Sequence, residues 1–345
     1  MTIKDVTTGQ LFSTVSAAIT GSNAGDVIQI SAGTYREDFP KILHNLTLKG
    51  VGGRAHLMPV GSPSNGQGIL VIDAPYVWLD HLELSGAAVP DGNGAGVRFE
   101  TGLELRITNS WLHDNQDGLL ANGVAGAVIK INNSEFDHNG AGDGYTHNLY
   151  AGNIALLNVL NSSFHDALGG HEIKSRALRT VIKGNHIADG PTADTSYSVD
   201  LPNGGRATVT NNYIEKGPNA PNSSFIHFGG ESFPVFANSA LNISANTVVN
   251  DRAGARFLLN QSQNSAGHPV VANVTSNTFY GLTADQLGND LLAVDNLFPT
   301  GTAPTALTPS STTDQYASAG SLTTADATLS DQHMLLSFGN AELAS

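Results

Sequence analysis

The sequence predicts an all-β fold, a single-stranded right-handed parallel β-helix (a solenoid) with a short capping helix at its N-terminal end. Three observations predict it. The 345 residues include 38 Gly and only 13% charged residues, a composition typical of turn-rich β proteins. Short strand-like segments recur at the spacing of solenoid coils. Hairpin signals such as Asn-Gly every 8 to 12 residues or so, which a β-sandwich needs, are sparse.

The repeat consists of Asn or Ser, then any residue, then a large apolar residue, within a short alternating strand. Its apolar members are 24, 28, 23, 27, 34 and 31 residues apart, which suits one coil of a solenoid with parallel strands. Each coil is expected to bury its apolar member against the next coil. The repeat occurs at Ser110/Leu112, Ser134/Phe136, Ser162/Phe164, Asn185/Ile187, Asn212/Ile214, Asn246/Val248 and Asn277/Phe279.

Three regions are expected along the chain. Residues 1–24 form an N-terminal cap, in which LFSTVSAAI supplies a short amphipathic helix over the open end of the solenoid. Residues 25–282 form the β-helix, including the strands near VWLDHLELSG. Residues 283–345 are rich in Thr, Ser, Ala and Pro and lack Lys and Arg, so they are expected to form a C-terminal wrapping tail or low-complexity extension.

Charge and composition exclude several classes of partner. The net charge of −14 argues against nucleic acid, because a nucleic-acid-binding protein needs a basic footprint to displace counterions. Residues 174–216 nevertheless hold six of the sixteen basic side chains, which suits an anionic ligand at one place. No segment is long and apolar enough to span a membrane. The absence of Cys excludes disulfides, thiol nucleophiles and Cys-ligated metals.

Four consecutive coils contain HNLYAG, HEIKSRA, YSVDLP and FIHFGG. They align if one apolar residue from each points into the core, namely Leu149, Ile173, Val199 and Ile226. Alternation along a strand then sends the neighbouring side chains outward, and stacked strands lie about 4.8 Å apart. The two expected outward columns are Asn148, Glu172, Ser198 and Phe225, and Tyr150, Lys174, Asp200 and His227.

These segments resemble known families. GDVIQISAGTYRE and the repeated strands resemble the pectate-lyase-like superfamily of right-handed β-helices over roughly residues 10–282. HEIKS resembles the strand with the catalytic Lys in the alginate-lyase and chondroitinase-B family of polysaccharide lyases, and NHIADG takes the place of that family's NxF turn. The resemblance implies that Lys174 is the Brønsted base. DGYTHN and GHEIKS show a second, partial resemblance to mannuronan C5-epimerases, which abstract the same C5 proton.

The chain departs from the lyase pattern at two points. Asp200 stands where that family places a catalytic Arg on the next coil, and Arg206 is the nearest basic residue after it. The calcium ligands of the family are not recognisable either. No cofactor is certain, and calcium is the one candidate ion, with Glu172 and Asp143 as its candidate ligands.

The leading expectation is a polysaccharide lyase that cleaves an acidic, uronate-containing polysaccharide or oligosaccharide by β-elimination. Lys174 acts as base or acid, and Arg176 and Arg206 hold the substrate carboxylate. The residues expected to take part in catalysis are Lys174, His147, His171, Tyr150, Asp200 and Arg206. Those expected to bind substrate are Arg176, Asn148, Tyr145, Tyr197, Asn203, His227 and Glu231.

Other functions stay open on the same scaffold. A glycoside hydrolase would take two carboxylates as acid and base from Glu172, Asp200, Glu231 and Asp143. A C5-epimerase would abstract the same C5 proton, and a non-catalytic glycan-binding matrix protein would use the aromatic side chains for stacking. A glycan substrate implies an extracellular or cell-surface location, although the N-terminus lacks the pattern of a cleavable signal peptide. The sequence does not set the oligomeric state.

Overall fold

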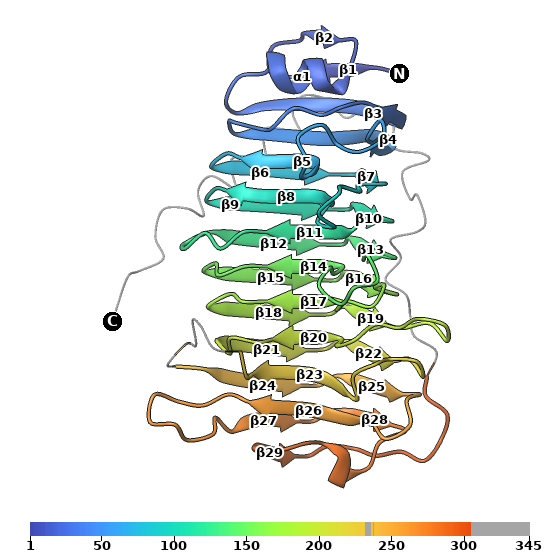
Figure 1. Cartoon of the computed structure of the whole chain (residues 1–345), viewed down its shortest axis with the longest axis vertical. Coiled ribbons are helices and arrows are strands. Elements are labelled where there is room, and N and C mark those ends of the chain that lie inside the picture. The colour runs from blue at the N-terminus through green and yellow to red at the C-terminus, as the bar shows by residue number, and fades with distance from the viewer. Residues whose placement is uncertain (232–235, 237, 305–345) are drawn as a thin grey trace. The chain divides into compact units, whose positions relative to one another are not determined.

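The computed structural model describes residues 1–231, 236 and 238–304. The expected C-terminal tail lies outside the described residues from residue 305 onward. Strands coil into a right-handed parallel β-helix, as the sequence predicts, and most coils carry three strands, one on each of three faces (Figure 1). In the part of the chain that is described, no helix has the length and apolar character needed to cross a bilayer.

The three faces are named here by their strands. Face 1 contains β5 (Gly68–Asp73), β8 (Ala95–Thr101), β11 (Asp117–Ala121), β14 (Leu149–Ala151), β17 (Ile173–Ser175), β20 (Val199–Leu201), β23 (Ser224–Gly229) and β26 (Arg256–Gln261). Face 2 contains β6 (Tyr76–Asp80), β9 (Glu104–Thr108), β12 (Val128–Asn132), β15 (Leu156–Leu160), β18 (Arg179–Lys183), β21 (Arg206–Thr210), β24 (Ala240–Ser244), β27 (Ala272–Thr275) and β29 (Leu291–Val294). Face 3 contains β7 (Leu82–Ser85), β10 (Trp111–His113), β13 (Glu135–Asp137), β16 (Ser163–His165), β19 (His186–Ala188), β22 (Tyr213–Lys216), β25 (Thr247–Asn250) and β28 (Thr278–Tyr280).

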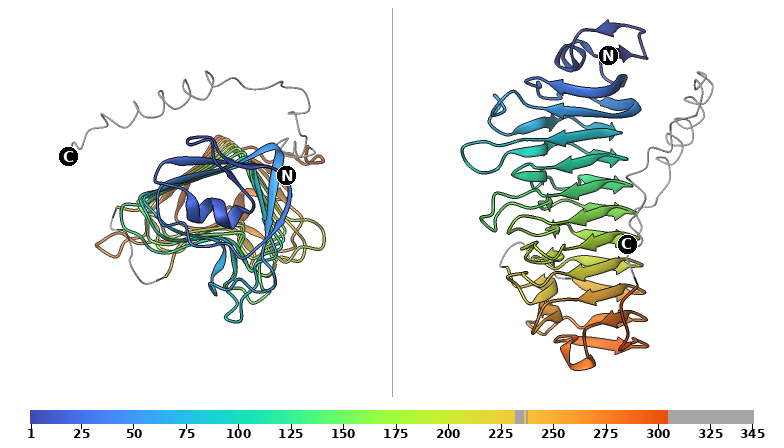
Figure 2. Two further views of the ribbon diagram at one scale, coloured as in Figure 1. Left: turned by 90° about the horizontal axis from the view of Figure 1, so that it is seen from above. Right: turned by 90° about the vertical axis from the view of Figure 1, so that its right-hand side faces the viewer.

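The N-terminal segment covers one end of the coils, as Figure 2 shows in the view from above. It contains β1 (Ile3–Asp5), β2 (Leu11–Phe12) and α1 (Val15–Gly21), and it leads into the long strands β3 (Asp26–Arg36) and β4 (Leu46–Met58). The helix begins where the Thr14 hydroxyl accepts the N–H of Ala17 at 3.0 Å, and its buried face joins the core. The predicted capping helix is therefore confirmed.

The other end of the stack reaches beyond residue 282. A short 3-10 helix, η1 (Ala284–Gln286), precedes β29, and β29 pairs in parallel with β27. The β-helix therefore includes residues that the sequence had placed in the tail.

The apolar members of the repeat stack in register on face 3, as their spacing predicts. Leu112 pairs with Phe136 and Phe136 with Phe164, and the two Phe rings are nearly parallel with centroids 4.8 Å apart. The column continues through the remaining members to Phe279. All of these side chains are fully buried, so the column forms one wall of the core.

The Ser and Asn members of the repeat form a buried corner ladder between face 2 and face 3. At each step, the backbone N–H of one member donates to the side-chain oxygen of the member one coil further on. Asn185 donates to Asn212, and Asn212 to Asn246, both at 2.9 Å. The ladder runs from Ser110 to Asn296, and it fixes the register between coils because a slip would leave buried polar groups without partners.

The residue before each ladder member lies in the left-handed region of the backbone. The φ angle is 53° at Asn109, 51° at Asn133 and 55° at Asn211. Asn adopts this conformation more readily than other residues with a side chain, which explains why Asn-Ser and Asn-Asn pairs mark this corner. The corner thus has a sequence signature that comes from backbone sterics and from hydrogen bonding together.

We predict that Asn212→Ala lowers the free energy of unfolding by about 3 kcal/mol, because it removes three buried hydrogen bonds, two from Asn185 and one to the carbonyl of Ile182. Urea denaturation followed by far-ultraviolet circular dichroism measures the change. Asn273→Ala is the matched control, because Asn273 is exposed and is expected to contribute less than about 0.5 kcal/mol. Equal losses in the two variants would contradict the role of the ladder.

Candidate active site

The strands β14, β17, β20 and β23 are stacked on face 1 (Figure 1). One outward column of polar side chains lies in register on them, namely Tyr150, Lys174, Asp200 and His227. The core-facing residues beside them pair in the same way and are fully buried, namely Leu149, Ile173, Val199 and Ile226. The alignment of these four coils is therefore confirmed. Parallel pairing places residues far apart in the sequence within contact distance.

The other predicted column is not outward, and this expectation is wrong. Its four members are buried, with at most 1% of the surface exposed, namely Asn148, Glu172, Ser198 and Phe225. The first three come just before their strands, where the chain bends from a loop into face 1, and strand alternation does not apply at such a corner. Asn148 donates to Glu172 inside the molecule, so neither residue reaches a substrate.

The carboxyl group of Glu172 accepts hydrogen bonds from other groups of the protein. Its Oε1 accepts the N–H of Ala167 at 3.0 Å and the hydroxyl of Thr195 at 2.9 Å. Burial raises its pKa well above the usual range. Asp143, the other candidate metal ligand, is exposed and caps a turn by accepting the N–H of Tyr145 at 2.8 Å. The two carboxylates therefore do not form the calcium site considered from the sequence.

Asp200 is the centre of the polar cluster. Its carboxylate lies 2.7 Å from Nδ1 of His227, 3.2 Å from Nζ of Lys174 and 3.3 Å from Nε2 of His171. Burial alone would raise the pKa of Asp200, but the His227 hydrogen bond and the charges of His171 and Lys174 hold it at about 2. Asp200 therefore stays ionised and anchors the three nitrogens.

A row of stacked rings lines the cluster. The ring centroids of His147 and His171 are 4.6 Å apart, and those of Tyr197 and His227 are 5.2 Å apart. Nδ1 of His147 accepts the N–H of His171 at 3.0 Å, and Nδ1 of His171 accepts the N–H of Tyr197 at 3.2 Å. Burial is the main cause that lowers the pKa of both imidazoles, to about 4 for His171. Both rings are therefore neutral at pH 7.

Arg176 forms the solvent side of the cluster. Its Nε donates to the hydroxyl of Tyr150 at 2.9 Å, its Nη1 donates to Asn203, and its Nη2 pairs with Glu231. Glu231 also lies 3.7 Å from Nζ of Lys174. Asn203 is fully buried, so its place is to hold the guanidinium rather than to contact a substrate.

Several residues singled out in the sequence are not part of the cluster. Arg206 begins β21 on face 2, is exposed, and pairs with Arg179 on the neighbouring coil. Tyr145 is 84% exposed in the loop before β14. Lys216 is fully buried, and its Nζ donates to the carbonyl of Ser196 at 2.6 Å. Of the six basic side chains in residues 174–216, only those of Lys174 and Arg176 therefore join the cluster.

Gln261 joins the cluster although the sequence did not single it out. Its Oε1 lies 3.0 Å from Nε2 of His227, so the two ring nitrogens of His227 face Gln261 and Asp200. β26 stacks on β23, which brings the segment RFLLNQ against FIHFGG. Extending the outward column by one coil leads to Leu259 instead, because Gln261 is in register with Gly229 and reaches His227 diagonally.

We predict that the contribution of His171 to stability is lost as the pH falls from about 6.5 to about 4. Burial lowers the pKa of His171 from 6.5 to about 4, so the unfolded chain takes up the proton first. Neutral His171 makes its full contribution to the free energy of unfolding above pH 6.5. This contribution, about 3 kcal/mol, is lost as the pH falls through about 4. Unfolding free energies across this pH range measure the loss.

His171→Gln should flatten this pH dependence. It should not abolish it, because the pKa values of His147 and His186 are also lowered, chiefly by burial. His138→Gln is the control, because half of the His138 side chain is exposed. An unchanged slope in His171→Gln would show that the buried ring does not titrate as described.

Comparisons with known proteins concern the fold. No protein-family model and no curated protein sequence matches the chain. An alginate lyase from Paenibacillus sp. str. FPU-7 has a TM-score of 0.59 and 15% identity, covering 82% of this chain and 96% of that chain. The pectin methylesterase from Yersinia enterocolitica has a TM-score of 0.47 and 11% identity, covering 85% of this chain and 92% of its own. The chain thus shares its right-handed parallel β-helix fold with this alginate lyase.

Proposed function

We propose that the chain is a polysaccharide lyase that cleaves an acidic, uronate-containing glycan by β-elimination. One observation carries the proposal. The carboxylate of Glu231 lies against Lys174 and Arg176 on the solvent side of the cluster, and 45% of the Glu231 side chain is exposed. A place where two cations hold a carboxylate at the surface suits a ligand with the same group, and a uronate has one.

Elimination makes three demands on a site. A base removes the C5 proton, the bond from C4 to the glycosidic oxygen breaks as the C4–C5 double bond forms, and the leaving oxygen receives a proton. Negative charge develops on the uronate carboxylate while the C5 proton leaves, so a cation beside that group lowers the barrier. Arg176 suits this role, because a guanidinium binds a carboxylate through two parallel hydrogen bonds.

Lys174 and Tyr150 are the proposed proton-transfer residues. They are paired on neighbouring strands, and the Tyr150 hydroxyl accepts a hydrogen bond from Arg176, so both lie beside the group proposed to bind the carboxylate. We assign the base to Lys174 and the acid to Tyr150.

The buried members of the cluster act as positioning residues in this proposal. Asp200 lies 3.2 Å from the Lys174 amine and holds it beside Tyr150. His227 and His171 fix Asp200, and Asn203 fixes Arg176. Because these groups are buried and hydrogen-bonded, the reacting side chains keep one geometry without the substrate.

The alginate lyase of similar fold supports the proposal, because it is an example of a lyase built on a β-helix of this kind. A polymeric glycan also suits an extracellular or cell-surface location. A hydrolase, an epimerase and a glycan-binding protein are the other outcomes of the test. Hydrolysis yields saturated ends, epimerisation leaves the chain length unchanged, and binding gives no product, whereas elimination yields an unsaturated uronide that absorbs in the ultraviolet.

We predict that the protein generates this absorbance from at least one polyuronate in a panel of alginate, polygalacturonate and chondroitin, and not from neutral dextran. Lys174→Ala should lower kcat by about 100-fold or more, because general-base catalysis contributes that much. Lys183→Ala is the matched control, since Lys183 is exposed on face 2 and should retain full activity. Full activity of Lys174→Ala with unchanged circular dichroism would remove Lys174 from the mechanism.

We further predict opposite effects on KM for the two partners at the solvent side. Glu231→Gln should lower KM for a uronate oligosaccharide, because it removes the internal carboxylate that competes for Arg176 and Lys174. Arg176→Ala should raise KM and lower kcat. Asp251→Asn, an exposed carboxylate elsewhere, controls for the change in net charge. A raised KM in Glu231→Gln would mean that Glu231 itself binds the substrate.

A further inference from the structure

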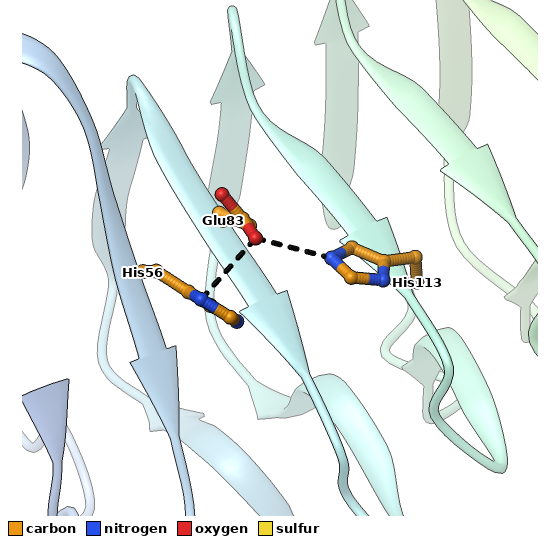
Figure 3. Close-up of side chains that lie close together, drawn as sticks. All are labelled: His56, Glu83 and His113. Atoms are coloured by element: carbon orange, nitrogen blue, oxygen red, sulfur yellow. Dashed lines mark hydrogen bonds and ion pairs between the residues drawn. The ribbon is translucent and has the colours of Figure 1, made fainter. Parts of the chain in front are cut away.

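A second group of titratable side chains lies on face 3, away from the strands that carry the cluster around Asp200. It comes from three consecutive coils, with His56 on β4, Glu83 on β7 and His113 on β10 (Figure 3). The side chains of all three point outward and toward one another. Oε1 of Glu83 lies between the rings, 3.2 Å from Nδ1 of His56 and 3.3 Å from Nε2 of His113.

These separations match the ligand spacing of a tetrahedral metal ion. Two ligand atoms bound about 2.0–2.1 Å from zinc at tetrahedral angles lie about 3.3 Å apart. The contact between His113 and Glu83 is also a long hydrogen bond, so the pair can hold either a shared proton or an ion. The three candidate ligand atoms in this group all lie within 4.8 Å of one another. Two imidazoles and one carboxylate with an open fourth position form a recurrent donor set for such ions.

The second nitrogen of each imidazole already has an oriented partner. Nε2 of His56 lies 2.7 Å from the hydroxyl of Ser85, and Nδ1 of His113 lies 2.7 Å from a carboxylate oxygen of Asp114. Metal-binding histidines usually have such a partner, because it fixes the tautomer and turns the other nitrogen toward the ion. Here the free edges of both rings are turned toward the same oxygen of Glu83.

Some of the charges around this group favour a bound cation and others oppose it. Burial is the main cause that lowers the pKa of His56, so its ring is neutral and can ligate an ion at pH 7. Asp114 and Asp137 add negative charge near His113, whereas Arg36 and Arg54 act against a cation at His56 and Glu83. Hydrogen bonds to Glu83 and Asp114 outweigh burial and raise the pKa of His113, so an ion must displace a proton there.

A neighbouring group, Asp137, His138 and His165, is a weaker candidate for the same chemistry. Both ring nitrogens of His165 face carboxylates, those of Glu135 and Asp166. Although burial lowers the pKa of His165, these two hydrogen bonds raise it to about 10. The ring is then a cation at neutral pH, and a metal would have to displace a firmly held proton.

We propose that His56, Glu83 and His113 form a binding site for zinc or a similar transition-metal dication, which fastens three consecutive coils and keeps one coordination position open to water. This site is separate from the proposed lyase site, and it does not depend on that function. A ligand that binds only the folded chain stabilises it in proportion to the logarithm of its concentration over Kd. Zinc is therefore expected to raise the unfolding temperature.

Titration of the metal-free full chain with zinc chloride in a calorimeter tests the proposal, with calcium chloride as the comparison. We expect one zinc ion per chain, a zinc-dependent rise in unfolding temperature, and no comparable response to calcium. Glu83→Gln, His56→Asn and His113→Asn should each weaken zinc binding by about tenfold or more. His186→Asn, which removes an imidazole elsewhere on face 3, should bind zinc like the unmodified chain.

Circular dichroism of each metal-free variant shows whether it has folded. If Glu83→Gln fails to fold, His56→Asn and His113→Asn decide the outcome. Cobalt added in place of zinc should give the visible absorption of a four-coordinate site in the unmodified chain and lose it in these variants. No zinc binding by the unmodified chain, or binding that survives all three substitutions and is lost in Asp137→Asn, would overturn the proposal.

Discussion

The buried hydrogen bonds of the corner ladder are the constraint on which the rest of this structure depends. Parallel strands of only three to five residues supply few hydrogen bonds each, and apolar alternation alone would tolerate a slip by two residues along the strand. The ladder removes that freedom, since each buried Asn binds the coils on both sides. The Asn212 side chain binds Asn185 and Ile182 on the preceding coil, and its backbone N–H donates to Asn246 on the following coil. If one coil slipped, buried polar groups on the neighbouring coils would lose their hydrogen-bond partners, and the folded state would be destabilised.

Fixed register turns sequence-distant side chains into neighbours. Lys174 meets Asp200 because β17 and β20 are in register, and His56 meets Glu83 because β4 and β7 are in register. Neither pair has a local motif, and neither is held by a loop of its own. The two groups lie on different faces of one scaffold, so the same stacking can serve a glycan on one face and an ion on another.

The sequence predicted those features that follow from local periodicity. Leu112 and Phe136 could be placed in the core, and Tyr150 could be aligned with Lys174, because alternation holds inside a strand. Prediction from alternation failed at the corners between faces, where the side chain of Glu172 points into the interior. The prediction also failed for Arg206. This residue begins the following strand on face 2, so its side chain is not among those that line the cluster on face 1. The metal-binding candidates on face 3 were missed because no resemblance directed attention to them.

The coils differ in length in two of their three connections. Between face 3 and face 1, residues 114–116 make a short connection and residues 138–148 a long one, and between face 1 and face 2 the same contrast holds for residues 74–75 and 262–271. The ladder occupies a different corner and is indifferent to these connections. The exposed middle of such a connection can therefore change in length without touching the corner ladder. Its buried residues, such as Asn139 and Asn148, hydrogen-bond to each other or to the next coil and have to be kept. Loop length beside the polar cluster and the register of the coils are then separately adjustable properties of one chain.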